Sequence, residues 1–325
     1  MSFPADRPRR LRRTSALRGL VAETRLHPAD LVQPLFVREG LDEPRDIPSM
    51  PGQVQHTRDS LRKAASAAAT AGVGGLLIFG IPAEKDPDGF GAWDPCGIAQ
   101  LAIADVTKEV GNATVVISDI NLDEYTEHGQ VGVLDATGDV DNDATLRAYA
   151  QVAVAQANSG AHVVAPSGMM DGQVAAVRRA LDQAGHDRVA ILAYAAKYDS
   201  AFYGPFRDAV ESRLTGTRST AQQDPANSRE ALREVLLDIE EGADMVMVKP
   251  AGLYLDVVRM VADAVHVPVS AYQTSGEYAA IEAAAAQGWL NRDRAIRESL
   301  TAIRRAGAGS VITYWATEIA EQLPS

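Results

Sequence analysis

Short apolar runs alternate with alanine-rich, amphipathic segments along almost the whole chain. The apolar runs are unbroken, a pattern typical of strands buried on both faces, as in parallel sheets. Eight strands are predicted, at residues 31–37, 75–79, 114–118, 162–165, 189–193, 245–248, 267–271 and 310–314. Helical spacing predicts helices at residues 58–71, 98–109, 143–158, 172–184, 228–241, 253–264 and 277–306.

This alternation predicts an α/β fold, a TIM (β/α)8 barrel, because each parallel crossover needs a covering helix. A doubly wound open sheet has the same alternation, and the count of strands favours the barrel. We assign residues 25–325 to the barrel domain and residues 1–24 to an extended N-terminal arm. Residues from about 200 to 227 are largely polar and lack a clear period, so we expect a long lid loop there.

Two lysines follow apolar strands directly. Lys249 ends the run MVMVK, and Pro250 then stops the strand; Lys197 follows the run VAILAYAA. In barrels, the carboxyl ends of strands carry catalytic side chains. A lysine held against apolar walls loses solvation of its ammonium form, so its pKa falls and the neutral amine can attack carbonyls. The alternative is a snorkelling lysine whose head reaches water.

If the two runs are neighbouring strands, both amines point into one pocket. Each ammonium then disfavours the other, which lowers the pKa of at least one of them further. Two carbonyl-capturing amines in one cavity suit a reaction that joins two carbonyl substrates.

The other predicted strand ends add polar side chains at the same face. These are Asp119, Asp123, Ser167, Gln273, Ser275 and Tyr314, and the lid adds Arg207, Arg218 and Gln222. A guanidinium grips a carboxylate in a bidentate fork, which favours small keto acids or amino-keto acids as substrates. Each arginine taken singly is more typical of a solvated surface.

Composition narrows the functional classes. The net charge of −12 gives no support to a nucleic-acid or acidic-membrane partner. The single cysteine, Cys96, allows neither an intrachain disulfide nor a thiolate-rich zinc site. The apolar runs are shorter than a membrane span, and no apolar signal core follows the basic N-terminus, so we expect a cytoplasmic enzyme.

The opening RPRRLRRTSALRGLVAET is the one strongly basic block in this acidic chain. It is either a nucleic-acid or targeting tail, or an arm that lies across the acidic surface of a sister subunit. We favour the arm.

Six motifs run along the chain: RRLRRT, SDINLDEYTEHG, APSGMMDG, AKYDSAFYGPFRDA, MVKPAGLYLDVVR and AYQTSGEY. Together they resemble those of the porphobilinogen synthase (delta-aminolevulinic acid dehydratase) family, over nearly the whole chain. MVKPAGLYLDVVR is similar to the segment with the family's Schiff-base lysine, and AKYDSAFYGPFRDA to the segment with its second active-site lysine. SDINLDEYTEHG, APSGMMDG, AYQTSGEY and RRLRRT follow in the family's order and spacing. The resemblance implies a lyase that condenses two 5-aminolevulinate molecules into porphobilinogen, with loss of two waters, on the way to haem and other tetrapyrroles.

The resemblance also assigns roles. It makes Lys249 the Schiff-base lysine for the first substrate, Lys197 the lysine for the second, and Asp119 an acid beside the amines. The second substrate's carboxylate would meet Arg207 and Arg218, with Gln222 nearby. Ser275 and Tyr314 match the pair that holds the first substrate's carboxylate.

Metal positions depart from the family pattern. Where zinc-dependent members carry three cysteines, this chain has Asn121, Asp123 and Val131, so we do not expect a catalytic zinc. Any hard cation there would depend on Asp123 and water, and a monovalent cation is an alternative. Gly168 stands where many relatives have aspartate.

Glu234 matches the glutamate that binds an activating, allosteric magnesium between subunits, although its spacing alone suits a solvated helix charge. Relatives assemble as octamers through their N-terminal arms, so the resemblance implies a homo-octamer here.

Two other functions stay open from the residues alone. A class I aldolase needs one Schiff-base lysine, and loss of condensation on changing Lys197 alone would count against it. A non-catalytic barrel whose arm serves assembly has no need for paired lysines.

Overall fold

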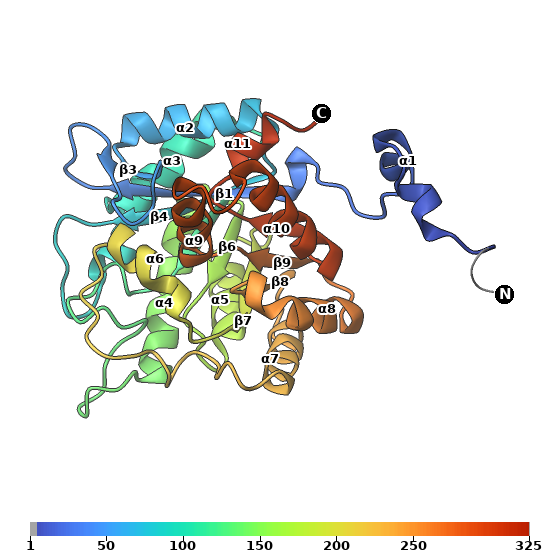
Figure 1. The fold of residues 1–325 in the computed structure, drawn as a ribbon. Helices are drawn as coiled ribbons and strands as arrows, with labels where there is room; N and C mark the ends of the chain where they lie inside the picture. The colour runs from blue at the N-terminus through green and yellow to red at the C-terminus, as the bar shows by residue number, and fades with distance from the viewer. Residues whose placement is uncertain (1–4, 325) are drawn as a thin grey trace.

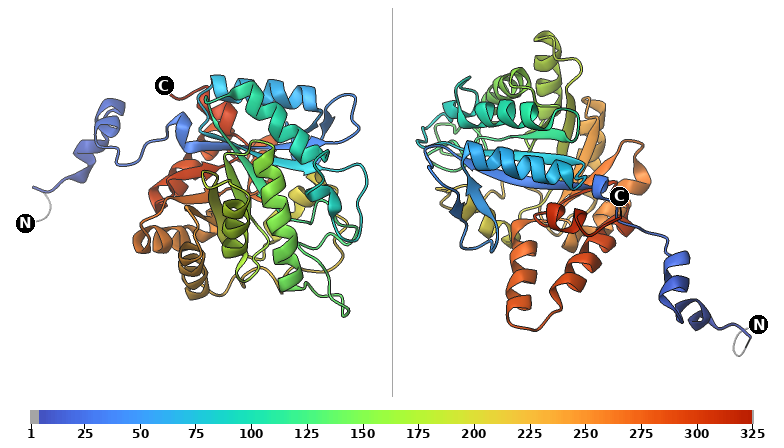
Figure 2. Two further views of the ribbon diagram at one scale, coloured as in Figure 1. Left: turned by 180° about the vertical axis from the view of Figure 1, so that it is seen from behind. Right: turned by 90° about the horizontal axis from the view of Figure 1, so that it is seen from above.

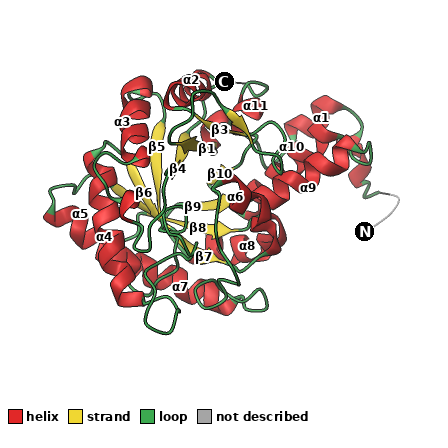
Figure 3. Cartoon of the chain, turned by 90° about the vertical axis from the view of Figure 1, so that its left-hand side faces the viewer, coloured by secondary structure: helices red, strands yellow, loops and turns green. Residues whose placement is uncertain are grey.

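The computed structural model describes residues 5–324, and within them eight parallel strands form a closed barrel. The barrel strands are β1 (Leu31–Arg38), β4 (Gly75–Ile81), β5 (Val115–Ile120), β6 (Val163–Pro166), β7 (Ala190–Lys197), β8 (Met245–Lys249), β9 (Val269–Tyr272) and β10 (Ser310–Ile312). Each strand pairs with the next, and Leu31 of β1 pairs with Val311 of β10, which closes the cylinder. Figure 3 shows the strands at the centre of a ring of helices. The predicted barrel is confirmed, and the open sheet is excluded.

Helices cover the outside of the barrel (Figure 1). They are α2 (Arg58–Thr70), α3 (Ile98–Val110), α4 (Asn142–Asn158), α5 (Gln173–Gln183), α7 (Arg229–Glu240), α8 (Leu255–Ala264), α9 (Ser275–Ala286), α10 (Arg292–Ala306) and α11 (Ala316–Ala320). The apolar faces of most long helices pack on the strands, as Leu61, Ala65 and Ala68 of α2 do. The exception is α9, which contacts α10 and the segment of η4 (Ala201–Tyr203) and α6 (Gly204–Ala209) instead. The periodic segments therefore become helices because burial of an apolar face stabilises them.

The predicted extent of one helix was wrong. Residues 277–306 form α9 and α10 rather than a single helix. Gly288 takes a positive φ of 72° between them, and the Asn291 side chain accepts a hydrogen bond from the Arg294 amide to cap α10. Alanine-rich periodicity hid this break, because alanine suits a helix on either side of it.

Small elements fill the connections. A short β2 (Arg45–Asp46) and β3 (Val54–His56) follow β1, and β3 pairs parallel with β1 outside the closed barrel. Single 3₁₀ turns are η1 (Pro8–Arg12), η2 (Pro28–Asp30), η3 (Phe90–Ala92), η4 (Ala201–Tyr203) and η5 (Gly252–Tyr254).

Seven of the eight barrel strands run further toward their carboxyl ends than the apolar pattern predicts, and three of these extensions carry polar site residues. β5 continues to Ile120 and so includes Asp119, β7 continues to Lys197, and β8 continues to Lys249. The polar ends remain strands because neighbouring strands extend equally far, which keeps their backbone groups paired.

The lid segment is more ordered than expected. Its first part forms η4 and α6 (Gly204–Ala209), so the expectation of a loop from about residue 200 was wrong at its start. The rest is irregular, and its two ends are held close, since Asp199 donates a backbone hydrogen bond to Gln223. Glu211 accepts hydrogen bonds from Arg38 and Arg45, which fixes the segment over the barrel.

The described part of the arm extends away from the barrel in both views of Figure 2. It contains η1 and α1 (Ser15–Leu20), and the Thr14 side chain caps α1. Leu11, Leu20 and Val21 expose much of their apolar surface. Residues 1–4 of the predicted arm lie outside the described residues. No helix in the described range 5–324 is long and apolar enough to cross a membrane.

Candidate active site

The two lysines end adjacent strands. Lys197 of β7 and Lys249 of β8 are direct register partners, so their side chains leave the barrel at one level. Lys197 and Lys249 expose only 4% and 6% of their surface, respectively. A snorkelling lysine keeps its head in water, so this alternative is wrong for both.

A bulge in β7 adds an aromatic ring beneath the two amines. β7 carries one extra residue between Ala193 and Ala196, where its register against β8 shifts. The ring centre of Tyr194 consequently lies 5.5 Å from Lys197 Nζ and 5.0 Å from Lys249 Nζ. Regular alternation would have placed Tyr194 on the opposite face from Lys197, which is why the sequence did not identify it.

Aromatic rings surround Lys249. Its Nζ lies 4.1 Å from the ring centre of Tyr272, 5.3 Å from that of Phe206 and 5.4 Å from that of Tyr203. Burial, and next the charge of Lys197, lower the pKa of Lys249 to about 7. A substantial share of Lys249 is therefore a neutral amine at neutral pH.

Lys197 has polar neighbours instead. Its Nζ donates a hydrogen bond to the Ser167 carbonyl oxygen at 2.5 Å. Burial lowers the pKa of Lys197, while the carboxylates of Asp123 and Asp119 act in the opposite direction. The ammonium form is thus better supported here than at Lys249.

Asp119 lines the same cavity as the two amines. Its Oδ2 accepts a hydrogen bond from Ser167 Oγ at 3.0 Å, and its buried Oδ1 finds no donor among the described residues. Burial raises the pKa of Asp119 to about 6, although both lysines oppose this shift. A carboxyl group that titrates near neutrality can both take and give a proton.

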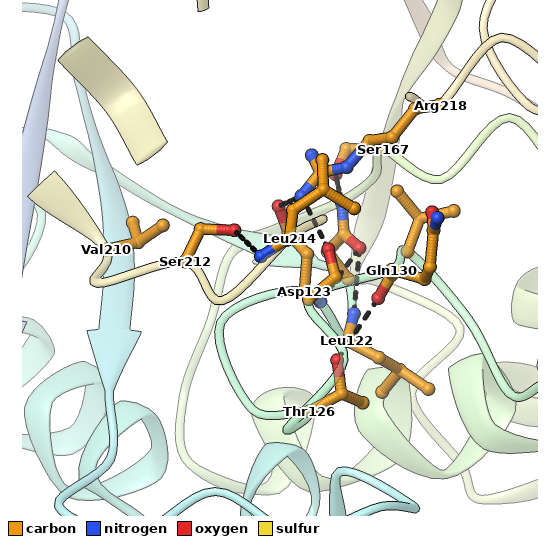
Figure 4. A network of polar contacts seen from close by, with 12 residues as sticks. Leu122, Asp123, Thr126, Gln130, Ser167, Val210, Ser212, Leu214 and Arg218 are labelled. Carbon is orange, nitrogen blue, oxygen red and sulfur yellow. Dashed lines mark hydrogen bonds and ion pairs between the residues drawn. The ribbon is translucent and has the colours of Figure 1, made fainter. Parts of the chain in front are cut away.

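Asp123 forms an ion pair with Arg218, which belongs to the predicted lid segment. Arg218 Nη2 lies 2.7 Å from Asp123 Oδ2 and also donates to the Gly129 carbonyl oxygen at 2.9 Å (Figure 4). Burial alone would raise the pKa of Asp123, but the Arg218 guanidinium and neighbouring groups lower it to about 2. The expected metal ligand is thus a charged partner of Arg218.

Among the buried donors without an acceptor in the described residues, three belong to residues that line the catalytic cavity: Arg207 Nε, Arg218 Nε and Gln222 Nε2. All three residues line one cavity together with both lysines and both aspartates. The cavity measures about 20 Å³, which is room for roughly one water molecule. Unpaired donors beside a buried amine form a receptor for a carboxylate.

Two predicted residues lie just behind the cavity. Ser275 Oγ accepts a hydrogen bond from the Phe206 amide at 2.9 Å, and the hydroxyl groups of Tyr314 and Tyr272 lie 3.1 Å apart. Neither Ser275 nor Tyr314 lines the cavity. Their contact partners, Phe206 and Tyr272, have rings that lie near Lys249 Nζ.

The sequence analysis did not identify the aromatic residues around Lys249 or the buried acid Glu124. Tyr203 and Phe206 lie within the motif around Lys197, and Tyr272 lies within AYQTSGEY, so the motifs contained the signal. Glu124 is buried next to Asp123, and burial, then the Asp123 charge, raise its pKa well above the usual range. An acidic residue within a polar loop motif gave no sign of such burial.

The positions of the family's zinc cysteines form a different network. Asn121 Nδ2 donates to Ser167 Oγ at 2.8 Å, and Val131 is fully buried. No group of three His, Cys, Asp or Glu side chains in residues 5–324 is arranged to hold a metal ion.

Glu234 lies elsewhere, on α7. It lines a polar cavity of about 340 Å³ together with Asp139, Asp171 and Glu230. Burial, and next the charge of Asp171, raise the pKa of Glu234. Carboxylates facing one cavity suit a hydrated hard cation bound through one or two of them.

Comparisons with known proteins agree over nearly the whole chain. A sequence model of the delta-aminolevulinic acid dehydratase family matches residues 5–322. The delta-aminolevulinic acid dehydratase of Streptomyces coelicolor is 63% identical over 324 residues, covering 99% of this chain and 98% of that protein. The Mycobacterium tuberculosis H37Rv protein of the same name is 62% identical, covering 98% of each chain. The solved delta-aminolevulinic acid dehydratase (porphobilinogen synthase) from Toxoplasma gondii, in complex with the reaction product porphobilinogen, matches with a TM-score of 0.95 and 40% identity. That match covers 98% of this chain and 91% of the other.

Proposed function

The chain belongs to the delta-aminolevulinic acid dehydratase (porphobilinogen synthase) family, and we propose that it performs this condensation through imines on Lys249 and Lys197. Two 5-aminolevulinate molecules become one porphobilinogen with the loss of two waters. The observation that carries the proposal is the pair of buried amines on adjacent strands, which share one cavity with unpaired guanidinium donors. Family membership excludes the non-catalytic barrel, and a second amine beside the first is more than an aldolase needs.

Lys249 is the nucleophile for the first substrate. Its neutral amine attacks the ketone carbonyl, and loss of water gives an imine whose protonated form is a cation. The faces of Tyr272, Tyr194 and Phe206 stabilise that cation, because ring quadrupoles attract positive charge. The imine withdraws electrons and acidifies the neighbouring C–H bond, which prepares this carbon for bond formation.

Lys197 binds the second substrate. The carboxylate of this substrate accepts hydrogen bonds from Arg207, Arg218 and Gln222, whose free donors face the same cavity. Holding both ends of a small keto acid fixes its carbonyl beside the first substrate and removes the entropic cost of bringing them together.

Asp119 moves protons between these steps. Its carboxyl group accepts protons from the activated C–H groups and returns them to the departing water oxygen. The pKa of about 6 suits both directions at neutral pH. One carbon–carbon and one carbon–nitrogen bond then form between the two substrates, and both lysines leave as free amines. The final deprotonation gives the aromatic pyrrole.

Entry of two substrates requires the lid to move. The closed cavity of about 20 Å³ cannot hold even one 5-aminolevulinate molecule. Displacement of α6 would carry Phe206 away from Ser275, and the hydroxyls of Ser275 and Tyr314 would then reach the first substrate's carboxylate. Residues 200–227 thus act as a lid that closes over bound substrates.

The proposed metal is a magnesium ion bound at Glu234. One or two carboxylates of the cavity would hold the ion and water would complete its coordination, as is usual for magnesium. Neither lysine lines this cavity, whereas Gln222 lines both it and the catalytic cavity, so the ion would act on the lysines indirectly, as an allosteric ion. Unchanged activity after chelation and on Glu234→Ala would contradict this site, and Glu240→Gln, at an exposed position of the same helix outside the cavity, serves as the charge control.

The arm supports assembly into an oligomer, which we propose is the family's octamer. Its exposed apolar residues Leu11, Leu20 and Val21 accompany a series of arginines, while the rest of the chain is acidic. A second copy offers the acidic surface that such an arm needs. Sedimentation of the intact protein and of Leu20→Asp checks this, since a stable octamer of the variant would contradict it. Cytoplasmic localisation is part of the same proposal.

Borohydride trapping tests the imines. The protein is incubated with 5-aminolevulinate, reduced, digested and analysed by mass spectrometry. Adducts are expected on Lys249 and Lys197, and none on Lys85, a partly buried lysine whose Nζ donates to backbone carbonyls of Val210 and Glu211. Porphobilinogen formation without any adduct on Lys249 would overturn the imine route.

A further inference from the structure

We propose that Tyr149 is a positioning residue for Lys197 and Arg218, and that it acts by occupying the space above Gly168. This inference rests on the role proposed above for Lys197. Tyr149 lies on α4, outside the catalytic cavity, and is completely buried.

Tyr149 and a side chain at position 168 exclude one another. A Cβ atom added to Gly168 would lie 1.8 Å from the Tyr149 hydroxyl oxygen, 2.6 Å from its Cζ and 2.8 Å from its Cε2. These distances are far below van der Waals contact, and both sites are in the packed core. Gly168, which departs from the aspartate of many relatives, is therefore required by this tyrosine.

The turn that Tyr149 covers holds two groups of the active site. Ser167, which precedes Gly168, accepts a hydrogen bond from Lys197 Nζ through its carbonyl oxygen at 2.5 Å. The Ser167 hydroxyl donates to Asp119 at 3.0 Å. A shift of the peptide between residues 167 and 168 would consequently displace the Lys197 amine and Asp119 together.

The Tyr149 hydroxyl reaches a second part of the site. It donates to the Val131 carbonyl oxygen at 2.7 Å. Two residues earlier in the same loop, the Gly129 carbonyl oxygen accepts a hydrogen bond from Arg218. One tyrosine therefore spans the turn behind Lys197 and the loop behind Arg218, which hold opposite ends of the proposed second substrate. The contact needs only the backbone carbonyl of Val131, so a cysteine is not needed at that position to fix the loop.

Four variants separate these links: Gly168→Ala, Tyr149→Phe, Tyr149→Leu and the double variant Gly168→Ala with Tyr149→Leu. Val152→Ala is the matched control, because Val152 is buried on the same helix and lies one turn away from Tyr149. For each protein, kcat, KM and the thermal midpoint are measured. The rate at which acetic anhydride modifies Lys197 is followed across pH, which reports the amine without any catalytic step.

Gly168→Ala is expected to lower kcat about 100-fold, the cost of displacing a catalytic group by roughly 1 Å. The modification profile of Lys197 should shift, while that of Lys249 should stay close to the wild type. Tyr149→Phe should mainly raise KM, by about tenfold, because the loop behind Arg218 loses its anchor. The double variant should recover about tenfold or more of the activity lost in Gly168→Ala, since leucine vacates the space.

Three results would overturn the proposal. They are a kcat of Gly168→Ala within about twofold of the wild type, an unchanged Lys197 modification profile in that variant, or a double variant no better than Gly168→Ala. If Gly168→Ala does not fold, the deciding test compares Tyr149→Phe with Val152→Ala at equal thermal stability. Equal KM values for these two variants would refute the link between Tyr149 and Arg218. Absence of borohydride trapping at Lys197 in the wild type would refute the proposed imine instead, while the modification profiles would still report positioning.

Discussion

Lys249 and Lys197 occupy equivalent places on neighbouring strands, yet their surroundings differ. Four aromatic rings enclose the Lys249 amine, and no described residue accepts a hydrogen bond from it. The Lys197 amine donates to a backbone carbonyl and lies near two carboxylates. Equal burial therefore gives two different amines, because pKa depends on nearby charges as well as on desolvation.

The difference suggests a division of labour. Lys249, whose pKa is about 7, supplies a neutral amine before substrate arrives. Lys197 keeps more of its proton and lowers the pKa of Lys249 through its charge. Within the proposed mechanism, the first imine therefore forms on Lys249, and a proton must leave Lys197 before the second can form.

Lys249→Met removes the better nucleophile and should have the largest effect. The expected loss in kcat is about 10⁴-fold, as for other residues that act as covalent catalysts. Porphobilinogen formation is followed by a colour reaction, with Lys85→Met as the control. Retention of more than a tenth of the wild-type rate would show that Lys249 is not the first amine.

Lys197→Met should lower the rate of condensation about 10³-fold. Borohydride reduction of this variant should still trap one substrate molecule on Lys249. The remaining adduct separates the roles of the two lysines. If the variant condensed normally, the chemistry would need one amine only, as in an aldolase.

Asp123→Asn should make Lys197 more like Lys249. Removal of the carboxylate lowers the pKa of Lys197, and Arg218 loses its ionic partner, so kcat/KM is expected to fall about 30-fold. The pKa is read from the pH dependence of acetic anhydride modification, with Asp208→Asn as a surface control. An unchanged Lys197 profile would contradict the proposed influence of Asp123.

The same variant has a stability signature with a definite sign. The folded pKa of Asp123, about 2, lies below the ordinary aspartate value of 3.8. The carboxylate therefore stabilises the fold above the unfolded pKa, and this contribution is lost as the pH falls toward 2. The difference in unfolding free energy between wild type and Asp123→Asn should thus be larger at pH 7 than at pH 3. A difference independent of pH would count against the ion pair.

The smallest expected effect is the acid limb of the wild-type pH profile. The neutral form of Lys249 is lost as the pH falls through about 7, so kcat/KM should decrease toward tenfold per pH unit below that value. In Lys197→Met the rate of adduct formation on Lys249 should show the same limb at higher pH, because a neighbouring positive charge is gone. A limb at the same pH would show that the two amines do not interact.

The local pattern of apolar and polar residues was enough to predict much of the fold. Apolar runs marked all eight barrel strands, and both lysines were recognised because each directly follows such a run. The break between α9 and α10 was missed, because alanine suits both helices and the turn at Gly288 has only a local signal. Tyr194 was missed because the bulge in β7 reverses the side on which its ring lies.

The sequence by itself determined the barrel, the two lysines and the family, since these depend on periodicity and on contiguous motifs. The tertiary structure alone decided which amine is the more neutral, because that depends on rings and carboxylates brought together from different strands. It also decided why position 168 is glycine, since Tyr149 reaches it from a helix on the outside of the barrel. Pairings between distant segments leave no local pattern, and they become visible only when the barrel closes.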